Sequence, residues 1–159
     1  MKHFFTLAVC LSVLFACNSS KESTETTSKT KTNLSSKNMQ ALPQKIEMEI
    51  VSRGFYNALI LQDGLLTVKN NREDLGKTLK LNSNQLQEFK VAYNQFELSK
   101  LDEYLPTTNK RFSDASKASS IKITKNNVEF FSNDFDTNNP PLELSDLVKL
   151  LVNSAATIK

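Results

Sequence analysis

An Asp-Gly pair between two apolar runs is the feature that most constrains the fold. Asp63-Gly64 separates the runs 58–61 and 65–68, and Asp-Gly is a pair that two-residue hairpin turns prefer. The preceding stretch 45–53 alternates apolar and polar residues with a period of two, which is typical of a half-buried strand. Gly54 then tolerates the positive φ of the turn that follows. The sequence therefore predicts three antiparallel strands at the start of the folded part.

A second hairpin is predicted further along the chain. Asn126-Asn127 separates the apolar runs 120–124 and 128–131. Asparagine accepts the left-handed backbone conformation that a two-residue turn needs. The polar stretch from 105 to about 117 precedes this hairpin and is predicted to be a long loop.

Two helices are predicted, one on each side of the second hairpin. The first begins at the capping residues Asn82 to Asn84 and runs to about Ser99. Its apolar residues recur at spacings of three and four, which we interpret as a core stripe; they are Leu86, Phe89, Tyr93 and Phe96. The second helix spans about 141–154, after prolines that a first helical turn tolerates. Its predicted inner face consists of Leu142, Leu147, Leu150 and Leu151.

The predicted order of elements is β-β-β-α-β-β-α. Strands joined as hairpins favour an antiparallel sheet, and amphipathic helices bury their apolar stripe against one face of such a sheet. The predicted class is therefore α+β, with a sheet of about five strands and both helices packed on one face. This single small domain is expected to cover residues 42–159.

The opening segment has the layout of a secretory signal peptide. Lys2 gives a positive start, and the apolar run 4–16 follows. A membrane-spanning helix needs about 20 apolar residues, more than this run supplies. The stretch Leu14-Phe15-Ala16-Cys17 resembles the lipobox of bacterial lipoproteins. That resemblance implies a signal peptide of residues 1–16, cleavage after Ala16 and a diacylglyceryl group on Cys17.

The cysteine count agrees with a lipid anchor. The chain has two cysteines, and Cys10 lies within the apolar run that cleavage would remove. Cys17 would then have no partner for a disulfide, and two acyl chains suffice for stable membrane attachment. No Asp follows Cys17, so we expect the protein in the cell envelope at the outer membrane rather than the inner one.

A Ser/Thr-rich tract separates Cys17 from the folded part. Residues 18–41 include eleven serines and threonines and very few apolar side chains. Such a composition cannot bury enough surface to offset the entropy of ordering. Residues 17–41 are therefore predicted to be a disordered tether. A flexible coil of this length has a mean end-to-end distance of about 27 Å.

Composition removes most catalytic chemistry. The one histidine, His3, lies in the predicted signal peptide, and the three glycines are isolated from one another. Ser-His-Asp catalysis, His/Cys zinc sites and Gly-rich phosphate loops are thus excluded. The net charge of +3 is spread along the chain, which argues against a nucleic-acid partner. We expect no metal, no cofactor and no enzymatic activity.

Carboxylates leave two hypotheses open. A glycosidase-like site needs two carboxylates set across a cleft, and the candidate pairs are Glu73-Asp74, Asp102-Glu103 and Asp134/Asp136. The stretch 133–139 has the oxygen density of a calcium loop but lacks the glycine and glutamate of an EF-hand. We favour a polar loop that caps the final helix.

The folded part also resembles the emfourins, small bacterial inhibitors of thermolysin-type metalloproteases. The similar stretches are IVSRGFYNALIL (50–61), FELSKL (96–101), Asp114 ahead of SIKIT, and Asp134-Phe135-Asp136 with Pro141, Leu142 and Leu147. Emfourins often carry an SGGFAG signature. Here Ser52, Gly54 and Phe55 agree with it, whereas Arg53 and Asn57 replace glycines. The resemblance implies inhibition of a secreted protease.

Two stretches are candidates for contact with a partner. Arg53, Phe55 and Tyr56 lie beside the first turn, and Tyr and Arg are enriched in binding hot spots. The alternative is that both aromatic rings plug the end of the sheet. Arg111 and Asp114 lie in the long loop, where functional residues concentrate, although Asp114 could instead bond the backbone of its own loop. We expect a membrane-tethered binding or accessory domain, with a structural envelope protein as a further alternative.

Overall fold

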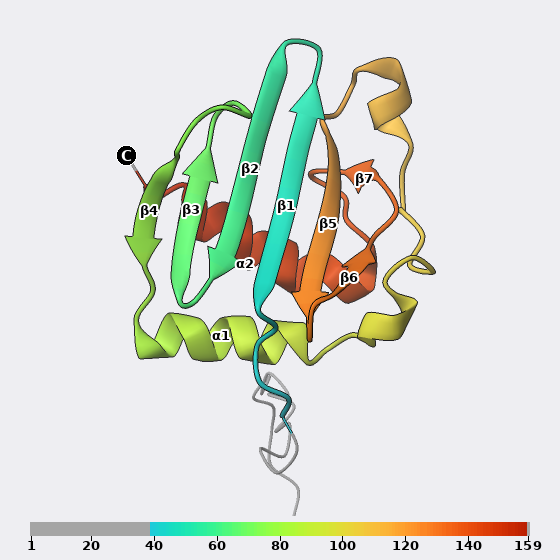
Figure 1. Cartoon of the computed structure of the whole chain (residues 1–159). Helices are drawn as coiled ribbons and strands as arrows, with labels where there is room; N and C mark the ends of the chain where they lie inside the picture. The colour runs from blue at the N-terminus through green and yellow to red at the C-terminus, as the bar shows by residue number, and fades with distance from the viewer. Residues whose placement is uncertain (1–38, 159) are drawn as a thin grey trace, which may run out of the picture. The chain divides into compact units, whose positions relative to one another are not determined.

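The computed structural model describes residues 39–158, and the predictions for residues 1–38 lie outside that range. The fold is α+β, as predicted (Figure 1). An antiparallel sheet of seven strands has the order β4-β3-β2-β1-β5-β6, with β7 pairing β5 beyond the end of β6. The strands are β1 (Lys45–Ser52), β2 (Phe55–Gln62), β3 (Leu65–Lys69), β4 (Lys77–Lys80), β5 (Ala118–Lys125), β6 (Val128–Phe131) and β7 (Phe135–Asp136).

The predicted turns set the register of the sheet. Gly54 has φ +68° in the β1–β2 turn, and the residues flanking that turn, Ser52 and Phe55, pair directly. Asp63 and Gly64 both have positive φ between β2 and β3, and so do Asn126 and Asn127 between β5 and β6. Positive φ at both central residues defines the type I′ turn, whose twist matches that of the strands it joins.

One helix crosses the sheet behind its strands, and the other runs along the lower end of the sheet and packs against the first (Figure 1). Helix α1 (Ser83–Tyr93) begins with a capping box, in which Asn82 accepts from the Gln85 amide and the Gln85 side chain accepts from the Asn82 amide. Helix α2 (Ser145–Ala155) follows a short 3-10 helix, η4 (Leu142–Leu144). No helix within residues 39–158 is long and apolar enough to cross a membrane.

The core lies between the sheet and the helices. The alternation in β1 places Ile46, Met48 and Ile50 in it, as predicted, because successive side chains of a strand point to opposite faces. The predicted aromatic stripe, whose last residue lies beyond the end of α1, is also confirmed as core. Phe89 and Tyr93 are buried, while Leu86 and Phe96 pack partly buried against the same cluster. The helix-free face of the sheet carries the other half of each strand, including Glu47 and Glu49.

Four predicted details differ from the structure. The sheet has two more strands than expected, the short β4 and β7. Helix α1 ends at Tyr93, where the side-chain amide of Asn94 donates to the Lys90 carbonyl at 2.7 Å. The predicted continuation to Ser99 is a loop with the 3-10 helix η2 (Leu98–Lys100). Leu142 is exposed rather than part of the inner face. The predicted loop before β5 contains a third 3-10 helix, η3 (Lys110–Ser113).

The two edges of the sheet are short strands. Strand β4 has four residues and carries the exposed Lys77 and Lys80. Gly76 precedes it with φ +84°, and a side chain there would meet Thr67 Cγ2 at 2.6 Å and the Val68 carbonyl oxygen at 2.9 Å. A glycine is therefore needed for β4 to approach β3. Strand β6 is equally short, and Ser132 interrupts the pairing with β5 before β7 resumes it.

Candidate functional site

The structure brings the two predicted partner-binding stretches together at one end of the sheet. We call this surface, residues 52–56 and 110–117, the tip. Arg53 Nε lies 3.1 Å from Asp114 Oδ2, and the Lys117 ammonium lies 3.4 Å from the centre of the Phe55 ring. The β1–β2 turn thus contacts the loop around η3, as Figure 1 shows at the top of the sheet. Two segments about 60 residues apart in the sequence form one surface.

The side chains of the tip are mostly exposed. The exposed fraction is 90% for the Arg53 side chain and 55% for that of Asp114. Phe55 is 39% exposed and Phe112 79%. Phe55 therefore does not fully plug the end of the sheet, and the tip presents aromatic and charged groups to solvent.

Tyr56 faces a different environment. Its hydroxyl donates to Glu49 Oε1 at 3.1 Å, and the Arg72 guanidinium lies 5.2 Å from its ring centre. Partial burial, together with the hydrogen bond to Glu49, raises the pKa of Tyr56. The residue is half-buried on the helix-free face of the sheet, and it supports the tip from that side.

A buried carboxylate holds the η3 loop in place. Asp136 in β7 is fully buried and accepts from the Arg111 amide at 2.7 Å and the Lys110 amide at 2.8 Å. It also accepts from the Thr108 hydroxyl. Burial would raise the pKa of Asp136, but these hydrogen bonds and the charge of Arg111 hold that pKa below its usual range. Asp136 is therefore ionised, and its hydrogen bonds hold the η3 loop against β7.

Arg111 pairs with Asp136 and contributes little to the exposed surface. Its side chain is 8% exposed, and Nη1 lies 3.6 Å from Asp136 Oδ1. Nη1 also donates to the Thr108 carbonyl at 2.8 Å. The carboxylate that holds the loop is thus Asp136, while Asp114 pairs across the tip with Arg53.

The predicted cap of the final helix is not formed, because α2 has no side-chain hydrogen bond at its N-terminus.

The tip also contains Phe112 and Lys117, which were not among the predicted partner-binding residues. Phe112 stands alone among polar residues in a loop, and an apolar aromatic in such a setting is the signal that could have identified it. Lys117 offered no signal, because its position over Phe55 depends on the pairing of β1 with β5.

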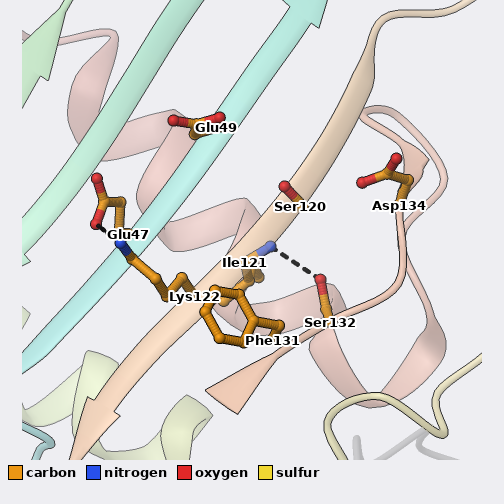
Figure 2. Close-up of a pocket in the computed structure, with 8 residues that line it drawn as sticks. All are labelled: Glu47, Glu49, Ser120, Ile121, Lys122, Phe131, Ser132 and Asp134. Atoms are coloured by element: carbon orange, nitrogen blue, oxygen red, sulfur yellow. Dashed lines mark hydrogen bonds and ion pairs between the residues drawn. The ribbon is translucent and has the colours of Figure 1, made fainter. Parts of the chain in front are cut away.

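A hollow of about 340 Å³ opens on the helix-free face of the sheet (Figure 2). Glu47 and Glu49 of β1 lie on one side, and Asp134 lies beyond β5 on the other. Ser132 forms part of the wall, where its hydroxyl accepts from the Ile121 amide at 2.8 Å. The hollow therefore joins carboxylates from different elements, in a combination that the sequence pairs did not predict.

Glu47 in the hollow is an ion-pair partner. Its Oε2 lies 2.8 Å from Lys45 Nζ and 3.1 Å from Lys122 Nζ. Burial would raise the pKa of Glu47, but hydrogen bonds and charge from both lysines lower it overall. A general acid at neutral pH needs a carboxyl whose pKa is raised. Glu47 is therefore unsuited to donate a proton.

Within residues 39–158, no three His, Cys, Asp or Glu side chains gather to hold a metal ion. Asp134 lines the hollow, whereas Asp136 is buried beneath the η3 loop, so the two do not share one site.

Comparisons with protein-family profiles, curated proteins and solved structures find no match to this chain. The tip and the hollow thus have to be interpreted from their own chemistry.

Proposed function

We propose that this chain is a lipid-anchored binding protein of the bacterial cell envelope that holds a partner protein through its tip. The observation that carries the proposal is the meeting of two distant segments, which present Phe55, Phe112 and the Arg53–Asp114 pair to solvent. Aromatic and arginine side chains are the groups that most often dominate protein interfaces.

The position of the tip suits a tethered protein. The described chain starts at the opposite end of β1, where the Gln40 amide donates to Asn94 Oδ1 at 2.8 Å and Asn94 donates back to the Gln40 carbonyl at 3.1 Å. Strand β1 has eight residues, which corresponds to about 26 Å between the two ends. A chain attached through its N-terminal side would keep the tip accessible.

The proposed anchor is the lipid on Cys17. It rests on the lipobox resemblance and on the sequence after Cys17, which contains no cysteine that could form a disulfide with it. The residues involved lie outside the part that the structure describes.

Site-specific cross-linking tests the binding role. A photo-reactive amino acid at Phe112 or Phe55, in the full chain expressed in its own host, should give the same partner adduct from both positions. Leu75 is the matched control, since it is 92% exposed but lies in the loop between β3 and β4. We expect no such adduct from Leu75. Adducts that are identical at all three positions, or absent from the two tip positions, would contradict a role for the tip.

Inhibition of a thermolysin-type protease is the second candidate function. The observation that favours it is the location of Ser52, Gly54 and Phe55, the residues that agree with the emfourin signature. All three belong to the β1–β2 turn or flank it, and all are exposed.

Residues 18–159, which contain every described core residue, should slow hydrolysis of a peptide substrate by such a protease at micromolar concentration. The effect should be lost on Phe55→Ala, because that change removes the exposed ring of the signature. Equal rates with and without the protein would reject this candidate and leave the binding role untouched.

A further inference from the structure

We propose that the tip recognises an acidic segment of its partner protein, with carboxylates that pair with Arg53 and Lys117. This inference rests on the proposed binding role and specifies the chemistry of the partner. It follows from the charge balance of the tip, the exchangeable character of its ion pair and the rigidity of its loop.

The charge balance of the tip is positive. Its residues include four cations and one carboxylate, Asp114. Arg111 is buried and neutralised by Asp136, so three exposed cations remain, namely Arg53, Lys110 and Lys117. A partner segment that carries carboxylates complements this surface, and such complementarity favours encounter and specificity.

The Arg53–Asp114 pair can exchange partners. Both side chains are largely exposed, and exposed ion pairs contribute little to stability. Arg53 Nε is engaged by Asp114, and a guanidinium has further N–H donors in a fixed fork that suits a carboxylate. A carboxylate of the partner could therefore bind Arg53 in addition to Asp114, or replace it, without loss of packing.

The aromatic rings provide an apolar contact beside the charges. Lys117 lies over the face of Phe55, which fixes the ammonium at the surface through a cation–π interaction. Phe112 packs one face against the Arg111 guanidinium, 4.4 Å from the ring centre, yet remains 79% exposed. An acidic segment with an apolar residue would match this combination of cations and rings.

Contacts within the chain hold the loop in place. Asp136 fixes the amides of Lys110 and Arg111, and Arg53 connects the loop to the β1–β2 turn. A surface that is organised in advance loses less conformational entropy on binding. Asp114 lies beside Arg53 and repels any anion placed directly over it. A flexible protein segment can place its carboxylates on either side of Asp114, which a continuous anionic bilayer surface cannot do, and so a protein segment fits this pattern better than a lipid surface.

The test uses residues 18–159 labelled with ¹⁵N and titrated with poly-L-glutamate of about 15 residues at low salt. We expect saturable amide shifts confined to 52–56 and 110–117. The apparent affinity should fall at least about tenfold in the double variant Arg53→Glu/Lys117→Glu, and several-fold at about 0.3 M salt, since screening weakens exposed charge pairs. The spectrum of the variant reports whether it is folded.

The matched control is Lys77→Glu/Lys80→Glu, which makes the same change in net charge at the β4 edge. Affinity should be retained in this control. Equal losses in both double variants would show that only net charge matters and would overturn the proposal. Binding to phosphatidylglycerol vesicles without binding to poly-L-glutamate would overturn it in favour of a lipid surface. Cross-linking at the tip without either interaction would retain the binding role and reject the acidic partner.

Discussion

Asp136→Asn should lower the melting temperature of the domain by about 10 to 20 °C. The carboxylate accepts from two backbone amides and from Thr108, and it faces the buried Arg111. Asparagine has no negative charge, and its side-chain NH₂ group would replace one carboxylate oxygen. That NH₂ group is a donor and would face the N–H and O–H donors that now bind Asp136. Arg111 would then remain buried without its counter-ion, which is the situation that makes a broken buried pair costly. Thermal unfolding followed by circular dichroism measures the change.

Asp114→Asn is the matched control for that variant. Asp114 has φ +55°, a conformation that asparagine tolerates well, and its ion pair with Arg53 is exposed. We expect its melting temperature to stay within about 2 °C of the unmodified protein. If Asp136→Asn lowers the melting temperature no more than Asp114→Asn does, the proposed role of Asp136 in holding the η3 loop is contradicted.

The pH dependence of stability gives a second measurement of the same residue. The pKa of Asp136 is lowered in the folded protein, whereas an aspartate in an unfolded chain has a pKa of about 3.9. The stabilisation from its ionised form is thus fully present above about pH 4 and is lost as the pH falls toward the pKa of the folded state. The difference in melting temperature between the unmodified protein and Asp136→Asn should therefore shrink as the pH falls below about 4.

Cys17→Ser should move the full chain from the membrane fraction to the soluble fraction. It should also abolish the incorporation of labelled fatty acid, because serine has no thiol to carry the diacylglyceryl group. Two acyl chains bury many methylenes, at about 0.8 kcal/mol each, so their loss should change the distribution almost completely. Fractionation of cells followed by immunoblotting measures it.

Cys10→Ser is the control that the chain itself offers. Cys10 lies within the predicted signal peptide, so its replacement should leave both the membrane fraction and the fatty-acid label unchanged. A membrane-bound, labelled Cys17→Ser protein would refute lipid attachment at that residue.

Local signals in the sequence were sufficient for most of the fold. The two-residue turns at Asp63-Gly64 and Asn126-Asn127 identified the hairpins, because their positive φ values are a property of the residues themselves. Strand β4 was missed because its sequence, Lys-Thr-Leu-Lys, has one apolar residue and shows no strand pattern. Its strand conformation comes from pairing with β3, which is a tertiary effect.

The site was predictable only in its components. Arg53, Phe55 and Asp114 were selected as separate stretches, yet nothing local indicates that Arg53 meets Asp114, since that contact depends on how the η3 loop folds back over β7. Arg111 was selected as a surface residue, but the carboxylate that engages it comes from Asp136, 25 residues further on. Contacts of this kind follow from packing and leave no periodic signal in the sequence.

Under the proposed membrane anchor, the edges of the sheet have a further consequence. Molecules anchored in one plane meet far more often than the same number in solution, and unpaired strand edges are the surfaces on which neighbours would aggregate. Here β4 places Lys77 and Lys80 on one edge, and the break at Ser132 leaves β6 too short to template a long strand on the other. A domain anchored as proposed would therefore share a crowded bilayer surface without neighbouring copies joining into a continuous sheet.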